Sequence, residues 1–213
     1  MYKKTDLYLG KRNRLIFYIT VYLLRISFLL IRFKIKIEGT DNIPDNSAFI
    51  LLPKHQQWTD IPLVAWAVSR PVYYVAKHEL FLTRFSNWYI SSLGGLPINR
   101  QRPIESRRSL SKMIELLNQG EGIVVFPEGT YYKNQMGPGN IGVVRLILSR
   151  FSFPFIPVGI NYSSGRLRTK VKISFGKPIF LERDKASGKP VNPPEEFLEI
   201  IMKEIARLSN LDE

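Results

Sequence analysis

The sequence contains no cysteine, which excludes disulfides, thiolate nucleophiles and cysteine-based zinc sites. Histidine is almost as scarce, because His55 and His78 are the only two among 213 residues. The sequence also lacks internal repeats and low-complexity segments. A hydrophobic fraction of 45% is ordinary for a globular protein, so extensive disorder is not expected. These bounds favour one sizeable domain with an appended segment.

Acidic residues are few and unevenly placed, and the formal net charge is +13. Residues 1–36 contain nine lysines or arginines against Asp6 alone, and no acid occurs between Glu128 and Glu182. Nucleic acid and an anionic membrane surface are the usual partners of so basic a chain. The aromatic residues form no base-stacking pattern and no helix-turn-helix signature is present, so we expect no nucleic-acid partner. A non-catalytic basic module that binds membrane or nucleic acid is the alternative to an enzyme.

No uninterrupted apolar run reaches the length of a helix that spans a bilayer. The longest, residues 15–31, has 17 positions with Arg25 inside it, whereas a spanning helix needs about 20 apolar residues. We therefore expect residues 1–32 to form a basic, apolar, membrane-associating helical segment, monotopic rather than spanning, on the cytoplasmic face. A signal peptide lacks its cleavage site here, and a soluble helix packed on the domain remains possible.

Residues 33–213 alternate between short apolar runs and helical periodicity. The pattern predicts strands at 33–38, 48–52, 72–76, 96–99, 122–126, 155–160 and 171–175, and helices at 60–69, 81–93, 104–119, 140–150 and 194–208. Alternation of this kind is typical of the α/β class, with a mostly parallel mixed sheet flanked by helices.

His55 and Asp60 lie in the connection between a predicted buried strand and the helix that follows it, a common location for active sites in α/β proteins. Residues five apart are separated by about 140° around a helix, so they can meet only if His55 precedes the helix that Asp60 opens. Asp60 can then orient one ring nitrogen while the other acts as a base. No serine in a G-x-S-x-G elbow accompanies them, so the base must activate a hydroxyl that arrives with a substrate.

Three further short motifs follow strands. Gly94 to Arg100 ends in an arginine that could bind a phosphate or carboxylate, Phe126-Pro127-Glu128-Gly129-Thr130 follows a buried strand, and Phe155 to Ile160 is an apolar block that contains Pro157.

The four motifs, in this order, resemble those of the 1-acylglycerol-3-phosphate acyltransferase family of glycerolipid acyltransferases. The matches are the histidine–four residues–aspartate motif at His55 and Asp60, G-x-x-x-x-R at Gly95 to Arg100, F-P-E-G-T at Phe126 to Thr130, and the proline-containing block. The stretch beginning Ala76-Lys77 also resembles the family.

This resemblance implies transfer of a fatty acyl group from a thioester of coenzyme A or acyl carrier protein to a lysophospholipid hydroxyl, with no metal or other cofactor. By carry-over, His55 is the general base and Asp60 its orienter. Lys77 and Arg100 contact the acceptor's phosphate, Glu128, Gly129 and Thr130 shape the acceptor site, and Pro157 lines the acyl region. Acceptors implied as alternatives are another lysolipid or glycerol-3-phosphate, and water would make the protein a hydrolase.

The chain departs from the family at Tyr131, where an arginine often follows E-G-T. The change removes one candidate ligand of the acceptor's phosphate, which leaves Lys77, Arg100 and Lys133 as the candidates to bind it. We expect Trp58 and Trp66 to serve in packing rather than in substrate contact, while Tyr131 and Tyr132 could line the acyl entry or meet a membrane interface.

Overall fold

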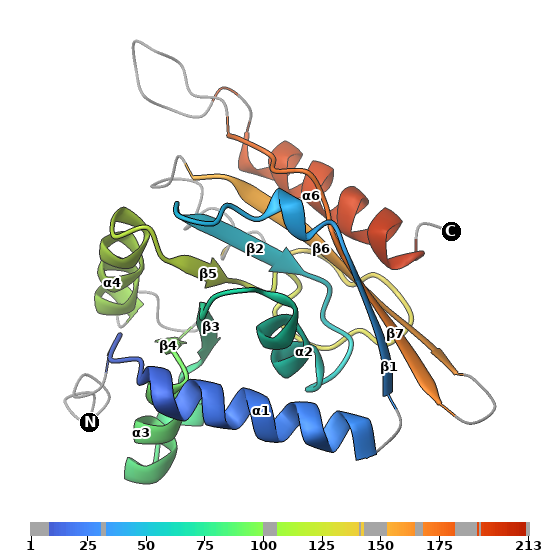
Figure 1. Ribbon diagram of the computed structural model, residues 1–213. Coiled ribbons are helices and arrows are strands. Elements are labelled where there is room, and N and C mark those ends of the chain that lie inside the picture. The colour runs from blue at the N-terminus through green and yellow to red at the C-terminus, as the bar shows by residue number, and fades with distance from the viewer. Residues whose placement is uncertain are drawn as a thin grey trace.

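The structure of the chain is a computed structural model that describes residues 9–30, 33–99, 106–140, 142, 153–164, 168–181, 191 and 193–211. A central sheet has the strand order β1-β7-β6-β2-β5-β3-β4. Its strands are β1 (Phe33–Glu38), β2 (Phe49–Pro53), β3 (Tyr73–Lys77), β4 (Gly95–Ile98), β5 (Gly122–Val124), β6 (Phe155–Ser164) and β7 (Thr169–Phe175). The described helices are α1 (Arg14–Leu30), α2 (Asp60–Ala67), α3 (Arg84–Ser92), α4 (Arg107–Asn118) and α6 (Pro194–Ser209), with short 3-10 turns η2 (Thr40–Asn42) and η3 (His78–Phe81) (Figure 1).

The expected α/β class and its mostly parallel sheet are confirmed. Strands β6, β2, β5, β3 and β4 run parallel to one another, whereas β7 pairs antiparallel with β6. Only four residues separate β6 from β7, too few for the crossover that a parallel pair requires. β1 then pairs parallel with β7 at the edge of the sheet. The helix expected at 140–150 lies outside the described residues except at positions 140 and 142.

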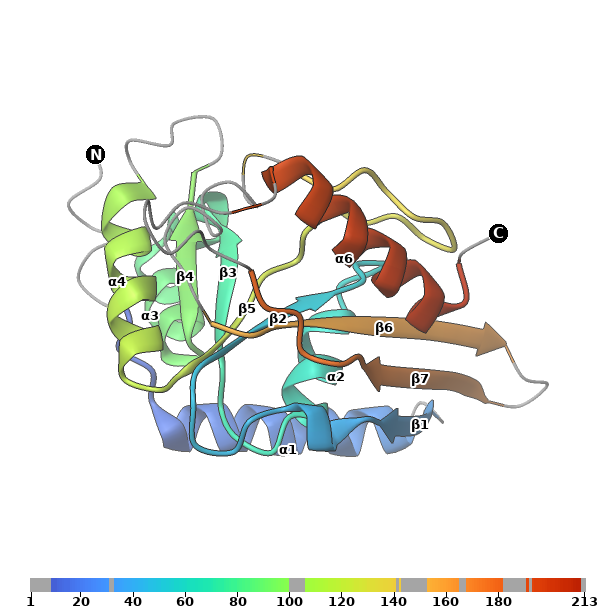
Figure 2. The same ribbon diagram turned by 90° about the horizontal axis from the view of Figure 1, so that it is seen from above.

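Helices cover both faces of the sheet, because the central strands are apolar on both sides. All five residues of β2 are buried. Ile50 and Leu52 pack with residues of α4 and α6, whereas Phe49 and Leu51 pack with α1 and α2. Figure 2 shows the sheet between α6 on one side and α1 on the other.

Helix α1 lies along the face of the domain that α2 also covers, and its inner residues Phe17, Val21 and Phe28 are buried. At its amino end, Asn13 N donates to Ser92 O of α3 (2.9 Å). Arg25 points toward α2, with its guanidinium 5.4 Å from the centre of the Trp66 ring. No helix within the described ranges has both the length and the apolar character needed to cross a membrane.

Candidate active site

His55, Glu128 and Lys77 lie at one edge of the sheet because parallel strands end there together. β2 leads into Lys54 and His55, β5 leads into the turn that contains Glu128, and β3 ends at Lys77. This carboxyl-terminal edge is where open α/β sheets present their sites. Residues 54–59, here called the His55 loop, connect β2 to α2 across it.

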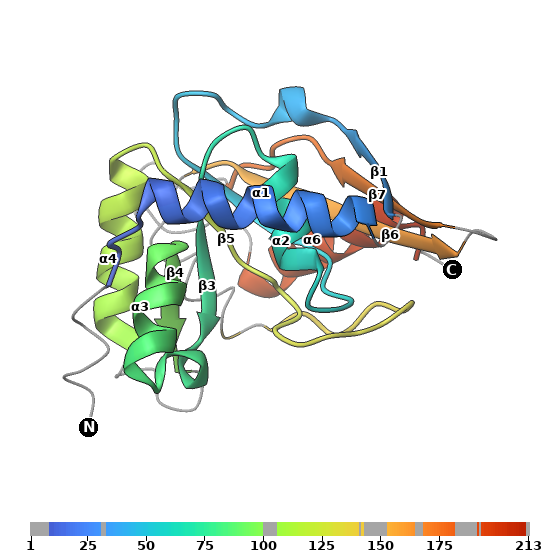
Figure 3. The same cartoon turned by 60° about the horizontal axis from the view of Figure 1, so that its bottom comes forward.

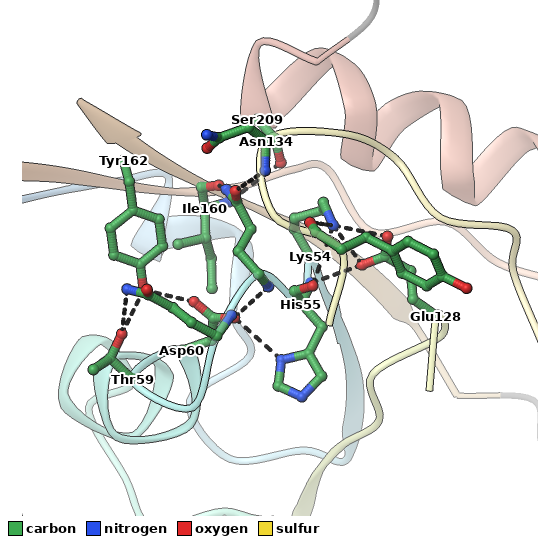
Figure 4. A network of polar contacts seen from close by, with 12 residues as sticks. Lys54, His55, Thr59, Asp60, Glu128, Asn134, Ile160, Tyr162 and Ser209 are labelled. Atoms are coloured by element: carbon green, nitrogen blue, oxygen red, sulfur yellow. Dashed lines mark hydrogen bonds and ion pairs between the residues drawn. The ribbon is translucent and has the colours of Figure 1, made fainter. Parts of the chain in front are cut away.

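His55 and Asp60 form a hydrogen-bonded pair in the arrangement that their spacing demands. His55 lies in the loop, Asp60 is the first residue of α2, and His55 Nδ1 is 3.1 Å from Asp60 Oδ2 (Figure 4). The carboxylate is fully buried and the imidazole nearly so, with a side-chain exposure of 10%. Since Nδ1 donates to the carboxylate, Nε2 presents its lone pair, and no partner for Nε2 occurs among the described residues.

The Asp60 carboxylate also holds the loop in shape. Oδ2 accepts the backbone N–H groups of Gln56 (2.5 Å) and Gln57 (2.8 Å), and Oδ1 accepts the Tyr162 hydroxyl (2.6 Å). Burial and the neighbouring carboxylate raise the pKa of Tyr162, so its hydroxyl stays protonated and donates. Because both oxygens accept hydrogen bonds from the protein, the carboxylate is held in one orientation. The fixed carboxylate in turn favours a single orientation of the His55 ring.

Glu128 forms a second buried carboxylate site on the other side of the loop. Its two oxygens lie 2.7 and 2.8 Å from Lys54 Nζ, and both side chains are fully buried. The same oxygens accept the backbone N–H groups of His55 (2.8 Å) and Gly137 (2.7 Å). Burial lowers the pKa of Lys54, while the Glu128 carboxylate raises it and offsets part of that effect. Glu128 therefore positions the backbone of His55, and its carboxylate is occupied by protein groups.

Two aromatic rings enclose the imidazole. The Phe126 ring stacks on it with 3.9 Å between centroids, and the Tyr131 ring meets it edge-on at 4.4 Å. Tyr131 is 52% exposed, so it forms the solvent side of the enclosure. The aromatic contacts hold the ring plane while Asp60 holds its Nδ1, so the orientation of Nε2 is fixed.

The remaining predicted residues lie in other motifs of the chain. Lys77 is exposed at the end of β3, next to Ile98 of β4, and Arg100 two positions beyond Ile98 lies outside the described residues. Gly129 adopts a positive φ of 71°, a value that a side chain disfavours, and turns the chain so that Thr130 is exposed.

Pro157 is buried in β6 on the side that α6 covers, close to Gly176 and Leu208. His55 lies toward α2 instead, against Phe126, so the structure does not bring Pro157 to the imidazole. Its acyl-lining role stays a prediction.

Sequence reasoning missed three residues that hold the site. Lys54 is fully buried, Tyr162 reaches Asp60 from β6, and Gln56 bonds Ile160 O (2.7 Å) and Asn134 N (2.8 Å). A lysine directly after an apolar strand could have signalled a buried pair, but no local pattern marks Tyr162. Trp58 was expected to pack and is 62% exposed, so that expectation is wrong, whereas Trp66 stacks on Phe28. Over the described residues, no group of three or more His, Asp or Glu is placed to hold a metal ion.

Comparison with known proteins agrees with the geometry. The family model described as Acyltransferase matches residues 34–161, which include His55, Asp60, Glu128 and Pro157. The chain is 29% identical over 156 residues to the 1-acyl-sn-glycerol-3-phosphate acyltransferase of Bacillus subtilis, an alignment that covers 71% of this chain and 76% of the relative. It is also 29% identical to the enzyme of that name from Streptococcus pneumoniae, over 66% of this chain and about half (54%) of the relative.

A solved structure shares the fold. The crystal structure of the 1-acyl-sn-glycerophosphate (LPA) acyltransferase PlsC from Thermotoga maritima superimposes with a TM-score of 0.65 at 25% identity. The superposition covers 87% of this chain and 75% of that one.

Proposed function

The chain belongs to the acyltransferase family, whose relatives named above are O-acyltransferases, and from this premise we propose that it acylates a lysophospholipid. The acceptor we propose is 1-acyl-glycerol-3-phosphate, which the names of the relatives support. The donor is an acyl thioester of coenzyme A or of an acyl carrier protein, used as a co-substrate without metal or other cofactor. The buried His55–Asp60 pair with Nε2 free of protein partners among the described residues is the observation that carries the proposal.

In the proposed reaction, His55 Nε2 removes the proton from the acceptor hydroxyl as its oxygen attacks the thioester carbonyl carbon. The tetrahedral intermediate then collapses, the C–S bond breaks, and the imidazolium returns the proton to the thiolate leaving group. Asp60 stabilises the imidazolium and keeps its Nδ1–H bonded. A thioester is already activated, so the protein needs a positioned base, an oxyanion donor and two binding sites, without a covalent intermediate on the protein.

We assign the acceptor phosphate to cations of the motifs that the sequence shares with the family. Lys77 is exposed at the same edge of the sheet, and Arg100 and Lys133 are the other candidates in the sequence. Tyr131 fills the position of the missing arginine and packs on the imidazole, so it limits the space next to His55 rather than supplying charge. Gly129 and Thr130 are proposed to shape the acceptor site, and Glu128 to act through the loop backbone.

We also propose that α1 associates with a membrane surface in a monotopic manner on the cytoplasmic side. Its exposed face is almost entirely apolar, with Leu15, Tyr18, Ile19, Tyr22, Leu23, Ile26, Leu29 and Leu30 all more than a third exposed. A helix with such a face, flanked by basic residues, suits a bilayer interface.

The test is a mass-spectrometric assay of the purified protein with lysophospholipids and acyl thioesters, which measures acylated lipid and free fatty acid separately. We expect phosphatidic acid as the main product and a loss of about 10²- to 10⁴-fold in kcat for His55→Ala. His78→Ala is the matched control, because it removes the only other histidine and should keep near wild-type turnover. A folded His55→Ala protein that turns over like His78→Ala would refute the role of His55, and fatty acid as the main product would indicate a hydrolase.

A further inference from the structure

The exposed apolar surface does not end at α1 but continues onto α3 and onto Leu82, which precedes α3. Leu82 is 72% exposed, Phe85 71% and Trp88 39%, so these side chains are not part of the core. The rings of Phe85 and Trp88 lie 5.9 Å apart and form one cluster. Surface apolar residues gathered in this way mark an interaction site rather than ordinary surface composition.

Helices α1 and α3 are held side by side, so their exposed residues belong to one surface. Besides the bond from Asn13 N to Ser92 O, the hydroxyls of Thr20 and Tyr89 lie 3.2 Å apart. Figure 3 shows α3 next to α1, on the side of the molecule that faces the viewer.

A third exposed apolar site lies at the start of α2, beside the reactive pair. Trp58 belongs to the His55 loop and is 62% exposed, and Ile61 is 38% exposed. Ile61 precedes Ala65 by one helical turn and shares its side of α2, the side on which Ala65 and Trp66 pack toward α1. The apolar surface therefore runs from α1 to the edge of the sheet that holds His55.

The charges around this surface identify the partner. Neither α1 nor α3 contains an aspartate or glutamate, while Lys11, Arg14, Lys77 and Arg84 are exposed around them. Glu79, which is exposed in η3 three positions before Leu82, pairs with His78 (3.0 Å), so the rim is mainly basic. An apolar and aromatic surface with a mainly basic rim is complementary to anionic headgroups above acyl chains. A two-fold dimer through the same surface would instead bring the basic rim against itself.

Building on the proposed function, we propose that α1, α3 and the start of α2 form a three-point docking face for an anionic lipid bilayer. The face consists of the α1 residues given above with Leu82, Phe85, Trp88, Trp58 and Ile61. A single helix lying in the interface leaves the protein free to roll about the helix axis. The contacts through α3 and through Trp58 remove that freedom and turn the edge that carries His55 toward the lipid. The acceptor then reaches His55 laterally from the membrane surface.

Vesicle binding of Phe85→Asp tests the α3 contact, and Phe180→Asp is its matched control. Phe180 is similarly exposed at 63%. It follows Ile179, which bridges Phe155 at the start of β6, so it lies near the amino-terminal ends of the parallel strands and away from the carboxyl-terminal ends that carry His55. With vesicles of phosphatidylcholine and anionic phosphatidylglycerol, we expect Phe85→Asp to bind at least about tenfold more weakly and Phe180→Asp within about twofold of wild type. Equal vesicle binding by the two variants would overturn the proposal, as would a Phe85→Asp protein that changes only its oligomeric state.

Activity separates this proposal from the proposed function. Phe85→Asp should lose turnover on vesicle-borne acceptor and keep it on a short-chain acceptor dissolved as monomers. A wild-type protein without turnover on either acceptor would refute the proposed function while leaving the vesicle result standing.

Fluorescence tests the orientation directly. In the variant Trp66→Phe/Trp88→Phe, Trp58 is the only remaining tryptophan, since the chain has three. We expect lipids brominated on their acyl chains to quench its emission in vesicles. Emission unchanged by brominated lipid, in a variant that still binds, would overturn the placement of the His55 edge at the membrane.

Discussion

The buried pair of Lys54 and Glu128 permits a quantitative test of how the His55 loop is held. The perturbation is Glu128→Gln, which preserves shape and removes the charge. The carboxylate accepts four hydrogen bonds: two from Lys54 Nζ, one from His55 N and one from Gly137 N. A glutamine has one acceptor oxygen, so its amide NH₂ must face either the ammonium or a backbone N–H.

The size of the effect follows from burial. Removing one partner of a buried ion pair typically costs about 3–5 kcal/mol because the other charge stays uncompensated. Lys54 keeps hydrogen bonds to the backbone oxygens of Tyr132 (2.8 Å) and His55 (3.2 Å), which favours the lower part of that range. We therefore expect Glu128→Gln to lower the free energy of unfolding by about 3–4 kcal/mol, a large share of the ~5–15 kcal/mol typical of a domain.

Urea unfolding followed by tryptophan fluorescence measures this difference. Glu204→Gln is the matched control, because Glu204 pairs with Arg207 at 2.6 Å on the surface of α6 and should cost less than about 1 kcal/mol. The double variant Lys54→Met/Glu128→Gln removes the stranded charge and should be at least about 1 kcal/mol more stable than Glu128→Gln alone.

Two results would refute the reasoning. If Glu128→Gln unfolded like Glu204→Gln, the pair would not support the loop. If the double variant were no more stable than the single one, the cost would not come from the uncompensated ammonium of Lys54. The turnover of folded Glu128→Gln should also fall, because the carboxylate holds the backbone of His55.

Two further predictions concern Tyr162 and Glu38. Tyr162→Phe removes the hydroxyl that donates to Asp60 Oδ1, so the carboxylate that orients His55 is held less firmly and kcat/KM should fall by about tenfold, while Tyr89→Phe, which removes a hydroxyl remote from the pair, should leave kcat/KM near the wild-type value. Hydrogen bonds from Lys36 and Lys172 lower the pKa of Glu38 from 4.5 to about 2, so its stabilising contribution is present above pH 4.5 and is lost as the pH falls toward 2; Glu38→Gln should flatten the acid dependence of stability in that window, measured by urea unfolding.

Most of the helices and strands were predictable from the sequence, because short-range periodicity of apolar residues determines them. The strand at 33–38 and the helix at 194–208 match β1 and α6 within one residue at each end. The meeting of His55 with Asp60 was also predictable, since both residues lie within one strand-loop-helix connection. The antiparallel direction of β7 was also predictable, because only four residues separate it from β6.

The residues that support the pair were not predictable in this way, because the order of the strands in the sheet, which local pattern does not reveal, brings them to it. Tyr162 lies 102 residues from Asp60 and reaches it only because β6 pairs with β2. The burial of Lys54 depends on Glu128, 74 residues away, which lies in the turn that follows the neighbouring strand β5. The exposure of Trp58 was not predictable either, because the expectation that a tryptophan packs rests on composition alone.

The two buried carboxylates turn two separate sequence motifs into one structural unit. Asp60 binds the backbone of Gln56 and Gln57 from the α2 side, and Glu128 binds the backbone of His55 from the β5 side. The loop between them cannot shift toward either helix or strand without breaking a charged hydrogen bond. The position of Nε2 therefore depends on the F-P-E-G-T motif as much as on the His-Asp motif. A substitution in either motif should lower kcat even where it touches no substrate, which makes Glu128 a positioning residue for His55.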